Sequence, residues 1–468
     1  MSERLLEEYS VGPVKVKIKK SDFCYYEVEE PQLSKLEESA KNKILSELYY
    51  NKIENLEEEV VKRLAEAGFK DESIEKILYH IKKIVLYGDI TPLLLDPNIE
   101  EIECKGYGIP ITIIHRNYPE CIRLYTNIQF SSDEEVIKVI EKLASRANKS
   151  VNVAKPFLEF SLPEGHRVAA TVSKEISLPG STFDVRKFPV RPFSIIEIIK
   201  QGSINEAIAS YLWLLLDYKS FIIILGPTGS GKTTLLTALL NLVNPNFKIL
   251  TIEDTPEINL KSPNWIRFIS RSTLYGNIDI TLMDLAKLAL RYRPDYLVVG
   301  EVRGKEIEAL IHAAASGHGS LTTFHGSKPI DAVTRITDLL SGDLAKLFLQ
   351  TIWAFVIVGN RKEGERSIKS VLSIYEIVPK GSKIRFKKVI EWSYSKKAFN
   401  PNSIEELVKK SYLLKKIKEN YSIDVSKEIV RRLEFLKKLK ENEILSFEEI
   451  YKKINEFYTG ERNEIVSM

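Results

Sequence analysis

Residues 226–234 have the types and the spacing of a loop that binds phosphate groups. They read Gly-Pro-Thr-Gly-Ser-Gly-Lys-Thr-Thr, and residues 226–233 match the pattern G-x-x-x-x-G-K-[ST] in full. The glycines let the backbone curl without clashes, so that N–H groups and a helix N-terminus point at one spot. We therefore predict that the loop binds ATP with Mg²⁺, with Lys232 at the β- and γ-phosphates and Thr233 on the metal. The predicted nucleotide-binding residues are Gly226, Pro227, Thr228, Gly229, Ser230, Gly231, Lys232, Thr233 and Thr234.

Carboxylates follow two other short apolar runs, at the point where each run ends. Glu253, Asp254 and Glu257 come after residues 248–252, and Glu301 follows residues 296–299 and one glycine. Crowded carboxylates are costly unless a cation or a task holds them together. In an open α/β sheet, ligands bind at the carboxyl ends of the strands. A buried strand that ends in an acid is also the Walker B arrangement, here with Glu301 in place of the commoner Asp.

Two histidines flank a further short apolar run. His318 and His325 bracket residues 320–324. The pattern favours a role in sensing the γ-phosphate or in coupling, and the alternative is a pair of surface histidines at the two strand ends.

Basic residues also occur near predicted turns and strand ends in the first half of the chain. They are Arg167, Arg186 and Lys187. By residue type alone, solvated charges are favoured over contacts with a phosphate.

The elements that must position these residues alternate between strand and helix, which is typical of the α/β class. Strands are predicted at 221–225, 248–252, 296–299 and 320–324, and helices at 233–242, 285–292 and 307–316. Residues 76–190 predict a smaller mixed α/β domain, because proline, glycine and aspartate turns separate short strands there. From residue 402 onward, leucine and isoleucine stripes predict amphipathic helices.

Composition limits the class of protein. Of 468 residues, 44% are apolar and 28% are charged, as in soluble globular proteins with several domains. The net charge of +4 is small and argues against a dedicated nucleic-acid binder. The first residues lack the apolar core of a signal peptide, and no run of about eighteen apolar residues predicts a membrane span.

The cysteines indicate a reducing compartment. Cys24, Cys104 and Cys121 are odd in number and far apart in the sequence, and no C-x-x-C pair occurs. We therefore expect neither a cysteine-rich zinc site nor a disulfide framework.

The order of these motifs resembles the secretion ATPases of the type II/type IV superfamily, the motors of type IV pili, type II secretion and archaella. After the phosphate-binding loop, residues 252–257 look like the family's Asp box, residues 290–303 like its Walker B segment and residues 315–325 like its His box. The resemblance covers about residues 85–390. The sequence looks like the archaeal branch of the family at residues 87–94, 96–100 and 183–188. The lack of a four-cysteine insertion fits that branch too.

The resemblance implies an α/β fold with a RecA-like P-loop motor domain, preceded by a smaller mixed α/β domain and followed by a helical C-terminal extension. The expected divisions are a variable N-terminal segment (1–75), the small domain (76–190), a linker (191–200), the motor domain (201–395) and the extension (396–468).

The resemblance also implies roles for individual residues. Glu253 would orient the attacking water and Glu301 would hold Mg²⁺ through water, although these two roles could be exchanged. His318 would contact the γ-phosphate. Arg167 and Arg186, contributed by the small domain, would lie near the nucleotide, where cations stabilise the charge of a transferring phosphoryl group.

The function implied is that of an ATP-hydrolysing ring, expected to be a hexamer, at the cytoplasmic face of the cell membrane. It would act on a polytopic membrane platform protein and power assembly of pilus-like filaments or secretion. One alternative is a motor that acts on nucleic acid, which the near-neutral charge and the lack of an aromatic, basic platform disfavour. The other is a nucleotide-gated scaffold without hydrolysis, against which Glu253 and Glu301 argue.

Overall fold

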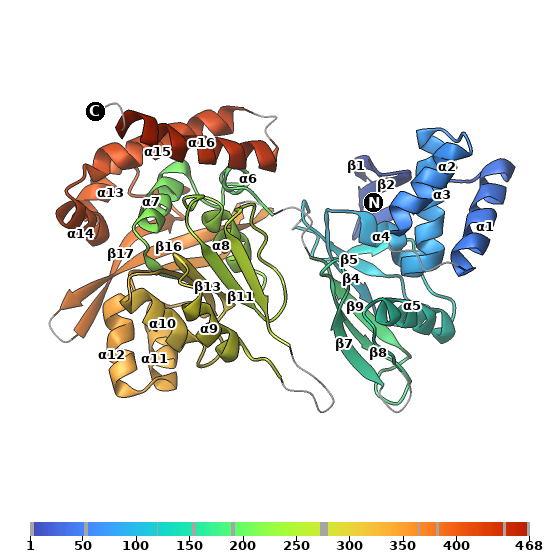
Figure 1. The fold of residues 1–468 in the computed structure, drawn as a ribbon, viewed down its shortest axis with the longest axis horizontal. Coiled ribbons are helices and arrows are strands. Elements are labelled where there is room, and N and C mark those ends of the chain that lie inside the picture. Colours follow the sequence, from blue (N-terminus) through green and yellow to red (C-terminus); the bar gives the residue numbers. More distant parts are fainter. Residues whose placement is uncertain are drawn as a thin grey trace. The chain divides into compact units, whose positions relative to one another are not determined.

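The chain folds into two compact units, residues 1–190 and residues 191–468, in the computed structural model (Figure 1). The structure describes residues 4–50, 55–118, 120–151, 156–188, 192–271, 279–363, 366–380, 383–442 and 446–465. Each unit is built around its own sheet. Within these ranges, no helix combines the length and the apolar character that crossing a membrane requires.

The first unit contains one sheet, in the order β1-β2-β3-β6-β5-β4-β9-β8-β7 among the described residues. The strands are β1 (Arg4–Val11), β2 (Val14–Lys20), β3 (Cys24–Glu29), β4 (Ile99–Cys104), β5 (Thr112–His115), β6 (Leu124–Thr126), β7 (Phe157–Ser161), β8 (Arg167–Thr171) and β9 (Thr182–Arg186). The helices are α1 (Lys35–Tyr50), α2 (Leu56–Glu66), α3 (Asp71–Lys82), α4 (Thr91–Leu95) and α5 (Asp133–Arg146), with short π- and 3₁₀-turns over Lys83–Tyr87 and Gly88–Ile90.

The predicted division of this unit at residue 75 does not match its sheet. Strand β3 pairs in parallel with β6, so strands from the predicted variable segment extend the sheet of the predicted small domain. Val14, Val16 and Ile18 of β2 are fully buried, and the lysines between them face outward. This alternation buries one face of the strand, so β2 belongs to the core of the unit.

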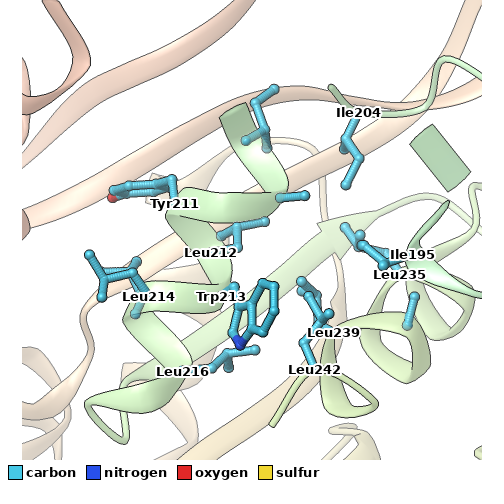
Figure 2. Close-up of a cluster of buried hydrophobic side chains, with 14 of the residues drawn as sticks. Ile195, Ile204, Tyr211, Leu212, Trp213, Leu214, Leu216, Leu235, Leu239 and Leu242 are labelled. Atoms are coloured by element: carbon cyan, nitrogen blue, oxygen red, sulfur yellow. The ribbon is translucent and has the colours of Figure 1, made fainter. Parts of the chain in front are cut away.

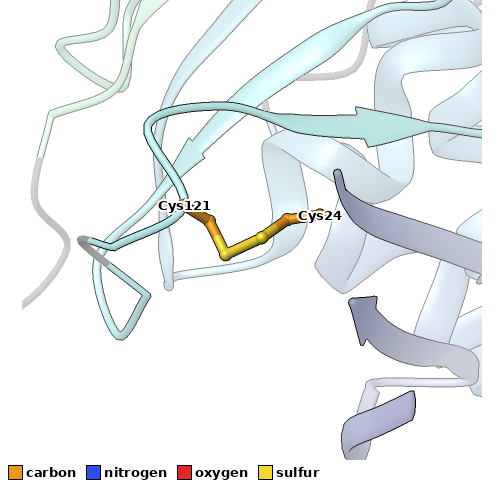
Figure 3. Close-up of a disulfide and its surroundings, with 2 residues drawn as sticks. All are labelled: Cys24 and Cys121. Atoms are coloured by element: carbon orange, nitrogen blue, oxygen red, sulfur yellow. A yellow bond between two sulfur atoms is a disulfide. The ribbon is translucent and has the colours of Figure 1, made fainter. Parts of the chain in front are cut away.

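The same strand pairing contradicts the prediction about the cysteines. A disulfide joins Cys24, at the start of β3, to Cys121, in the loop before β6 (Figure 3). The two residues are 97 positions apart in the sequence, yet Cys24 is the register partner of Leu124. Cys104 is a buried free thiol. Sequence separation was therefore a poor guide, because a parallel strand pair can bring distant segments together.

The second unit is a RecA-like α/β fold, as predicted. Its described strands form one sheet in the order β12-β11-β13-β14-β10-β15-β16-β17-β18, parallel from β12 to β15 and antiparallel beyond. The strands are β10 (Phe221–Gly226), β11 (Ile249–Glu253), β12 (Trp265–Ile269), β13 (Tyr296–Glu301), β14 (Gly319–His325), β15 (Ala354–Glu363), β16 (Arg366–Lys380), β17 (Lys383–Ser393) and β18 (Ala398–Asn400). Strand β14 lies between β10, which leads into the phosphate-binding loop, and β13.

Helices surround this sheet. They are α6 (Ile195–Lys200), α7 (Glu206–Asp217), α8 (Lys232–Leu240), α9 (Leu282–Arg291), α10 (Ile307–Ala315), α11 (Pro329–Leu339), α12 (Gly342–Thr351), α13 (Ile404–Lys410), α14 (Tyr412–Tyr421), α15 (Val425–Glu441) and α16 (Phe447–Ile465).

The predicted linker over 191–200 is largely part of the core. Ser194 and Glu197 form a capping box that starts α6, and the isoleucines of this helix are buried. Figure 2 shows Ile195 in the same cluster as Trp213 of α7 and Leu235 of α8. An apolar helix that packs into the core cannot serve as a flexible connection.

The C-terminal helices pack tightly on the RecA-like core rather than standing apart from it. Glu376 of β16 is fully buried, where its carboxylate accepts hydrogen bonds from Tyr211 Oη (2.7 Å), the backbone N–H of Tyr412 (2.6 Å) and Ser411 Oγ. A carboxylate at the N-terminus of α14 also complements the helix dipole. Because Tyr412 is the first residue of α14, the side chain of Glu376 connects the sheet, α7 and the C-terminal extension.

Candidate nucleotide-binding and catalytic site

The phosphate-binding loop curls between β10 and α8 in a shape that requires its glycines. Gly229 and Gly231 have φ of +73° and +87°, in the left-handed region that favours glycine. A Cβ on Gly226 would lie 2.5 Å from Ser230 Oγ and 2.7 Å from the carbonyl of Val358. Ser230 Oγ donates to the carbonyl of Pro227 at 2.7 Å and thereby holds the curl.

The side chains of the loop fit the predicted ligands. Lys232 begins α8, and its ammonium donates to the carbonyls of Gly226 (3.1 Å) and Pro227 (3.0 Å), so it folds back over the loop. Thr233 follows in the first turn of α8 and is partly exposed. The loop therefore presents glycine backbone, an ammonium group and a hydroxyl at the N-terminus of a helix. This is the donor set that suits the phosphates of ATP and a Mg²⁺ ion.

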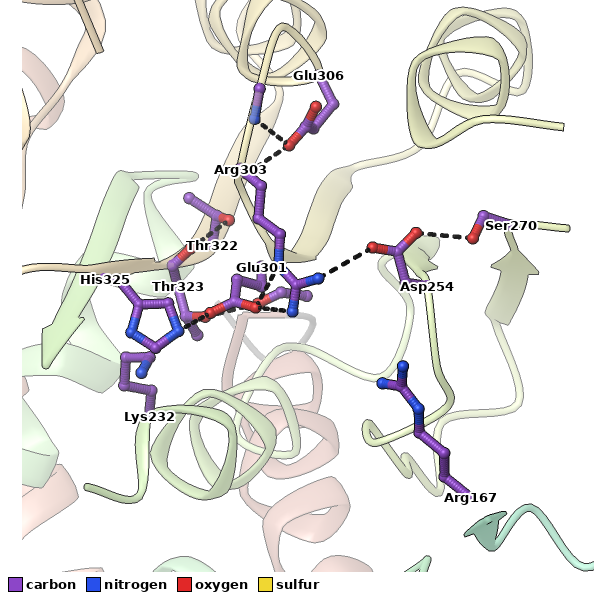
Figure 4. A network of polar contacts seen from close by, with 12 residues as sticks. Arg167, Lys232, Asp254, Ser270, Glu301, Arg303, Glu306, Thr322, Thr323 and His325 are labelled. Carbon is purple, nitrogen blue, oxygen red and sulfur yellow. Dashed lines mark hydrogen bonds and ion pairs between the residues drawn. The ribbon is translucent and has the colours of Figure 1, made fainter. Parts of the chain in front are cut away.

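Glu301 is the centre of a charged cluster at the same edge of the sheet (Figure 4). His325 Nε2 lies 2.5 Å from Glu301 Oε1, and Arg303 Nε and Nη2 donate to Oε2 at 2.8 and 2.5 Å. Figure 4 also draws Lys232, which begins α8 directly after the phosphate-binding loop. The register explains this convergence, because β14 pairs with both neighbours: Gly226 is opposite His325, and Glu301 is opposite Thr323.

Arg303 extends the cluster to the loop after β11. Its Nη1 lies 3.8 Å from Asp254 Oδ2, and Asp254 accepts a hydrogen bond from Ser270 Oγ at 2.7 Å. Glu306 accepts from the backbone N–H of Arg303 (2.5 Å) and of Gly304 (2.8 Å), and so fixes the turn that carries the arginine. The cluster thus holds an imidazole and a guanidinium against the two oxygens of one carboxylate. Carboxylates and arginines are group types that phosphoryl transfer uses.

Glu253 lies on the neighbouring strand but in a different environment. Its side chain is 3% exposed, and Oε1 accepts hydrogen bonds from the backbone N–H groups of Glu257 and Ile258, both at 2.8 Å. Oε2 has no hydrogen-bond partner among the described residues, and Arg267 Nε lies 3.6 Å from it. Burial raises the pKa of Glu253 to about 7. Glu253 therefore shapes the loop after β11 from within the protein.

Comparison with known proteins identifies the family of this chain. The family model described as "Type II/IV secretion system protein" matches residues 114–358, which is more than half of the chain. The chain belongs to this family. The match includes the phosphate-binding loop, both carboxylates and the two histidines.

Relatives of this chain occur in archaea and bacteria. Uncharacterized protein MJ1287 of Methanocaldococcus jannaschii is 39% identical over 269 residues, which cover 56% of this chain and 96% of that one. Uncharacterized protein MJ0900 of the same organism is 35% identical over 273 residues, covering 58% of this chain and 48% of that one. Type IV secretion system protein VirB11 of Bartonella quintana is 28% identical over 254 residues, covering 46% of this chain and 71% of that one. The chain spans about half the length of some of these relatives.

His318 does not lie at the phosphate-binding loop of its own chain, where it was predicted. It precedes β14 at the amino end of that strand, near Asp295, whereas His325 ends the strand beside Glu301. A strand of 7 residues spans roughly 20 Å. His318 is therefore remote from the phosphate-binding loop, and His325 is the histidine of the site. Strand direction was the signal that distinguishes them, because only carboxyl ends of the parallel strands meet at this edge.

The predicted basic residues of the first unit have different environments. Arg167 of β8 and Arg186 of β9 are register partners, and Arg167 forms an ion pair with Glu159 of β7. Lys187 is buried, and its ammonium donates to the carbonyl oxygens of Leu93 (3.1 Å) and Asp96. Lys187 is thus neither the solvated charge nor the phosphate contact that its residue type predicted, whereas both arginines remain on an accessible part of the sheet.

The raised pKa of Glu253 makes a prediction about stability. The folded protein holds this proton up to about pH 7, whereas the unfolded chain releases it near the ordinary value of 4.5. Stability contributed by Glu253 is therefore present at low pH and lost as pH rises from about 4.5 to about 7, with a magnitude of about 3 kcal/mol. Urea unfolding of the wild type and of Glu253→Gln, which does not titrate, should show this difference between pH 5 and pH 7.5. A difference between the two proteins that does not change with pH would contradict the burial argument.

Proposed function

We propose that this protein is an ATP-hydrolysing ring motor that drives a type IV pilus-like assembly or a secretion machine. The observation that carries the proposal is the convergence of the phosphate-binding loop with Glu301, His325 and Arg303 at one edge of the RecA-like sheet. Membership of the type II/IV secretion system family supports it, as does the similarity to VirB11, which its name places in a type IV secretion system.

Within this proposal, Lys232 and the loop N–H groups bind the β- and γ-phosphates, and Thr233 holds Mg²⁺. The metal would neutralise phosphate charge when bound. Glu301 orients or deprotonates the attacking water, because it is the accessible carboxylate at the carboxyl end of β13. His325 and Arg303 contact Glu301 directly and hold its carboxylate in place. This assignment gives Glu301 the role that was predicted for Glu253, because Glu253 is buried and bonded to its own loop.

The remaining parts of the proposal concern assembly. Arg167 and Arg186 are proposed to supply cations to a nucleotide in a ring, for which a hexamer is expected. Differences in ATP affinity between open and closed states of the subunits would drive the motion. The proposed partner is a polytopic membrane platform protein at the cytoplasmic face of the membrane, and the cargo is a pilin-like subunit or a secreted substrate.

The test is specific ATPase activity as a function of protein concentration, with light scattering to give the mass of the species. We expect activity per subunit to rise as rings form, and to be lost in Lys232→Ala at every concentration. Activity of a monomer that does not depend on concentration would overturn the ring, and a wild type without activity would overturn the motor. Addition of DNA or RNA should leave the rate unchanged.

A further inference from the structure

We propose that Lys369, on β16, is a further nucleotide-binding residue that contacts the phosphates shared by ATP and ADP. The inference rests on the proposed ATP binding and adds a cation from outside the phosphate-binding loop. The sequence did not predict this proximity, because Lys369 follows Gly231 by more than a hundred residues and belongs to no motif.

The stem of Lys369 lies directly against the loop. A Cβ placed on Gly231 would meet Lys369 Cβ at 3.6 Å and Cδ at 3.7 Å, which is ordinary van der Waals contact. Gly231 is the residue before Lys232, and its φ of +87° belongs to the curl that exposes the loop N–H groups. A lysine stem this close to the glycine places an ammonium within reach of a phosphate bound at the loop.

The register of β10, β15 and β16 places Lys369 level with the phosphate-binding loop along the strand direction. Strand β15 runs parallel to β10, with Ile357 opposite Leu225, and so continues past the point where β10 ends. Strand β16 returns antiparallel to β15, with Lys369 opposite Asn360. Lys369 therefore lies beyond the carboxyl end of β10, the edge at which ligands of such sheets bind.

Neighbouring residues hold this part of β16 in position. Ser370 is 2% exposed, and its Oγ donates to the carbonyl of Ser203 at 2.8 Å. The backbone N–H of Val371 donates to the same carbonyl at 3.0 Å. The backbone of Lys369 is thus anchored on its carboxyl side to the loop before α7.

The order of the strands indicates which part of the nucleotide Lys369 serves. Glu301 and His325 reach the loop from β13 and β14, on one side of β10, whereas β15 and β16 lie on the other side. Lys369 approaches the loop from the side away from the catalytic cluster. We therefore assign it to the phosphates common to ATP and ADP rather than to the γ-phosphate.

The experiment measures ADP binding by calorimetry for the wild type, Lys369→Met, Lys369→Arg and Lys362→Met. Methionine keeps the stem and removes the charge, and Lys362 is an exposed lysine of the same hairpin, on β15. Loss of a charge-assisted hydrogen bond should raise the Kd of Lys369→Met for ADP about tenfold. The ratio of the Kd of Lys369→Met to that of the wild type should become smaller at high salt. Lys369→Arg should stay within about threefold of the wild type, Lys362→Met should be unchanged, and kcat of Lys369→Met at saturating ATP should stay within about twofold.

Each other outcome has a distinct meaning. A wild type that does not bind ADP overturns the proposed function itself. A wild type that binds ADP, with Lys369→Met of equal affinity and equal thermal stability, overturns only the role of Lys369. An equal rise in the Kd for ADP of Lys369→Met and Lys362→Met would show that the effect comes from the overall charge of the hairpin. It would overturn the specific role of Lys369. A fall in kcat at unchanged ADP affinity would move Lys369 to the chemical step and overturn its assignment to the shared phosphates.

Discussion

Glu301→Gln is expected to lower the turnover of ATP by about two to three orders of magnitude, the range that a general base contributes. Glutamine has the size of glutamate but neither accepts the proton of the attacking water nor carries the charge that holds His325 and Arg303. Because the phosphate-binding loop is untouched, the affinity for ATP should change by no more than a few-fold. Steady-state ATPase rates together with equilibrium binding of ATP measure both quantities.

Two other substitutions make this result specific. Asp331→Asn removes an exposed carboxylate of α11 and should leave turnover unchanged. Glu253→Gln should retain most of the activity, because glutamine can still accept from the N–H groups of Glu257 and Ile258. The role of base would return to Glu253 if the turnover of Glu301→Gln stayed within about fivefold of the wild type while that of Glu253→Gln fell about a hundredfold.

Removal of the disulfide is expected to destabilise the first unit by about 5 kcal/mol, the value that chain entropy gives for a closed loop of roughly 100 residues. Cys24 and Cys121 are 97 residues apart, so the bond restricts a large part of the unfolded chain of this unit. Urea unfolding of the oxidised wild type and of the double variant Cys24→Ala/Cys121→Ala measures the difference.

A reductant provides the internal control for this prediction. Dithiothreitol should lower the stability of the wild type towards that of the double variant and should not affect the double variant. Cys104→Ala should keep the full response to the reductant, because Cys104 is a free thiol. An oxidised wild type that unfolds at the same urea concentration with and without dithiothreitol would show that the bond contributes nothing.

The fold class and the family could be predicted because their signals are local. The pattern over 226–233 carries the phosphate-binding loop, and its glycines are where the backbone needs positive φ or close approach. Glu301 was identified because it ends a short apolar run, and the end of a buried parallel strand is a defined place in an α/β sheet. These inferences need only neighbouring residues.

The errors arose where distance along the chain was taken as a guide to distance in space. The cysteines appeared unrelated until β3 paired with β6, and residues 1–75 appeared separate although β1, β2 and β3 extend the sheet. Glu253 and Glu301 appeared equivalent as acids after strands. Burial separates them, since the loop after β11 folds over Glu253 and donates two N–H groups to it.

By itself, the sequence determined that this chain has a phosphate-binding loop in a RecA-like domain of the type II/IV secretion system family, because each motif is read within a few residues. Only the tertiary structure decided which histidine reaches Glu301, which cysteines form a disulfide and which lysine of β16 lies next to Gly231. Those contacts depend on the direction and register of strands from distant segments. Side-chain burial and backbone hydrogen bonds across the whole fold select that register, and no short stretch of sequence contains it.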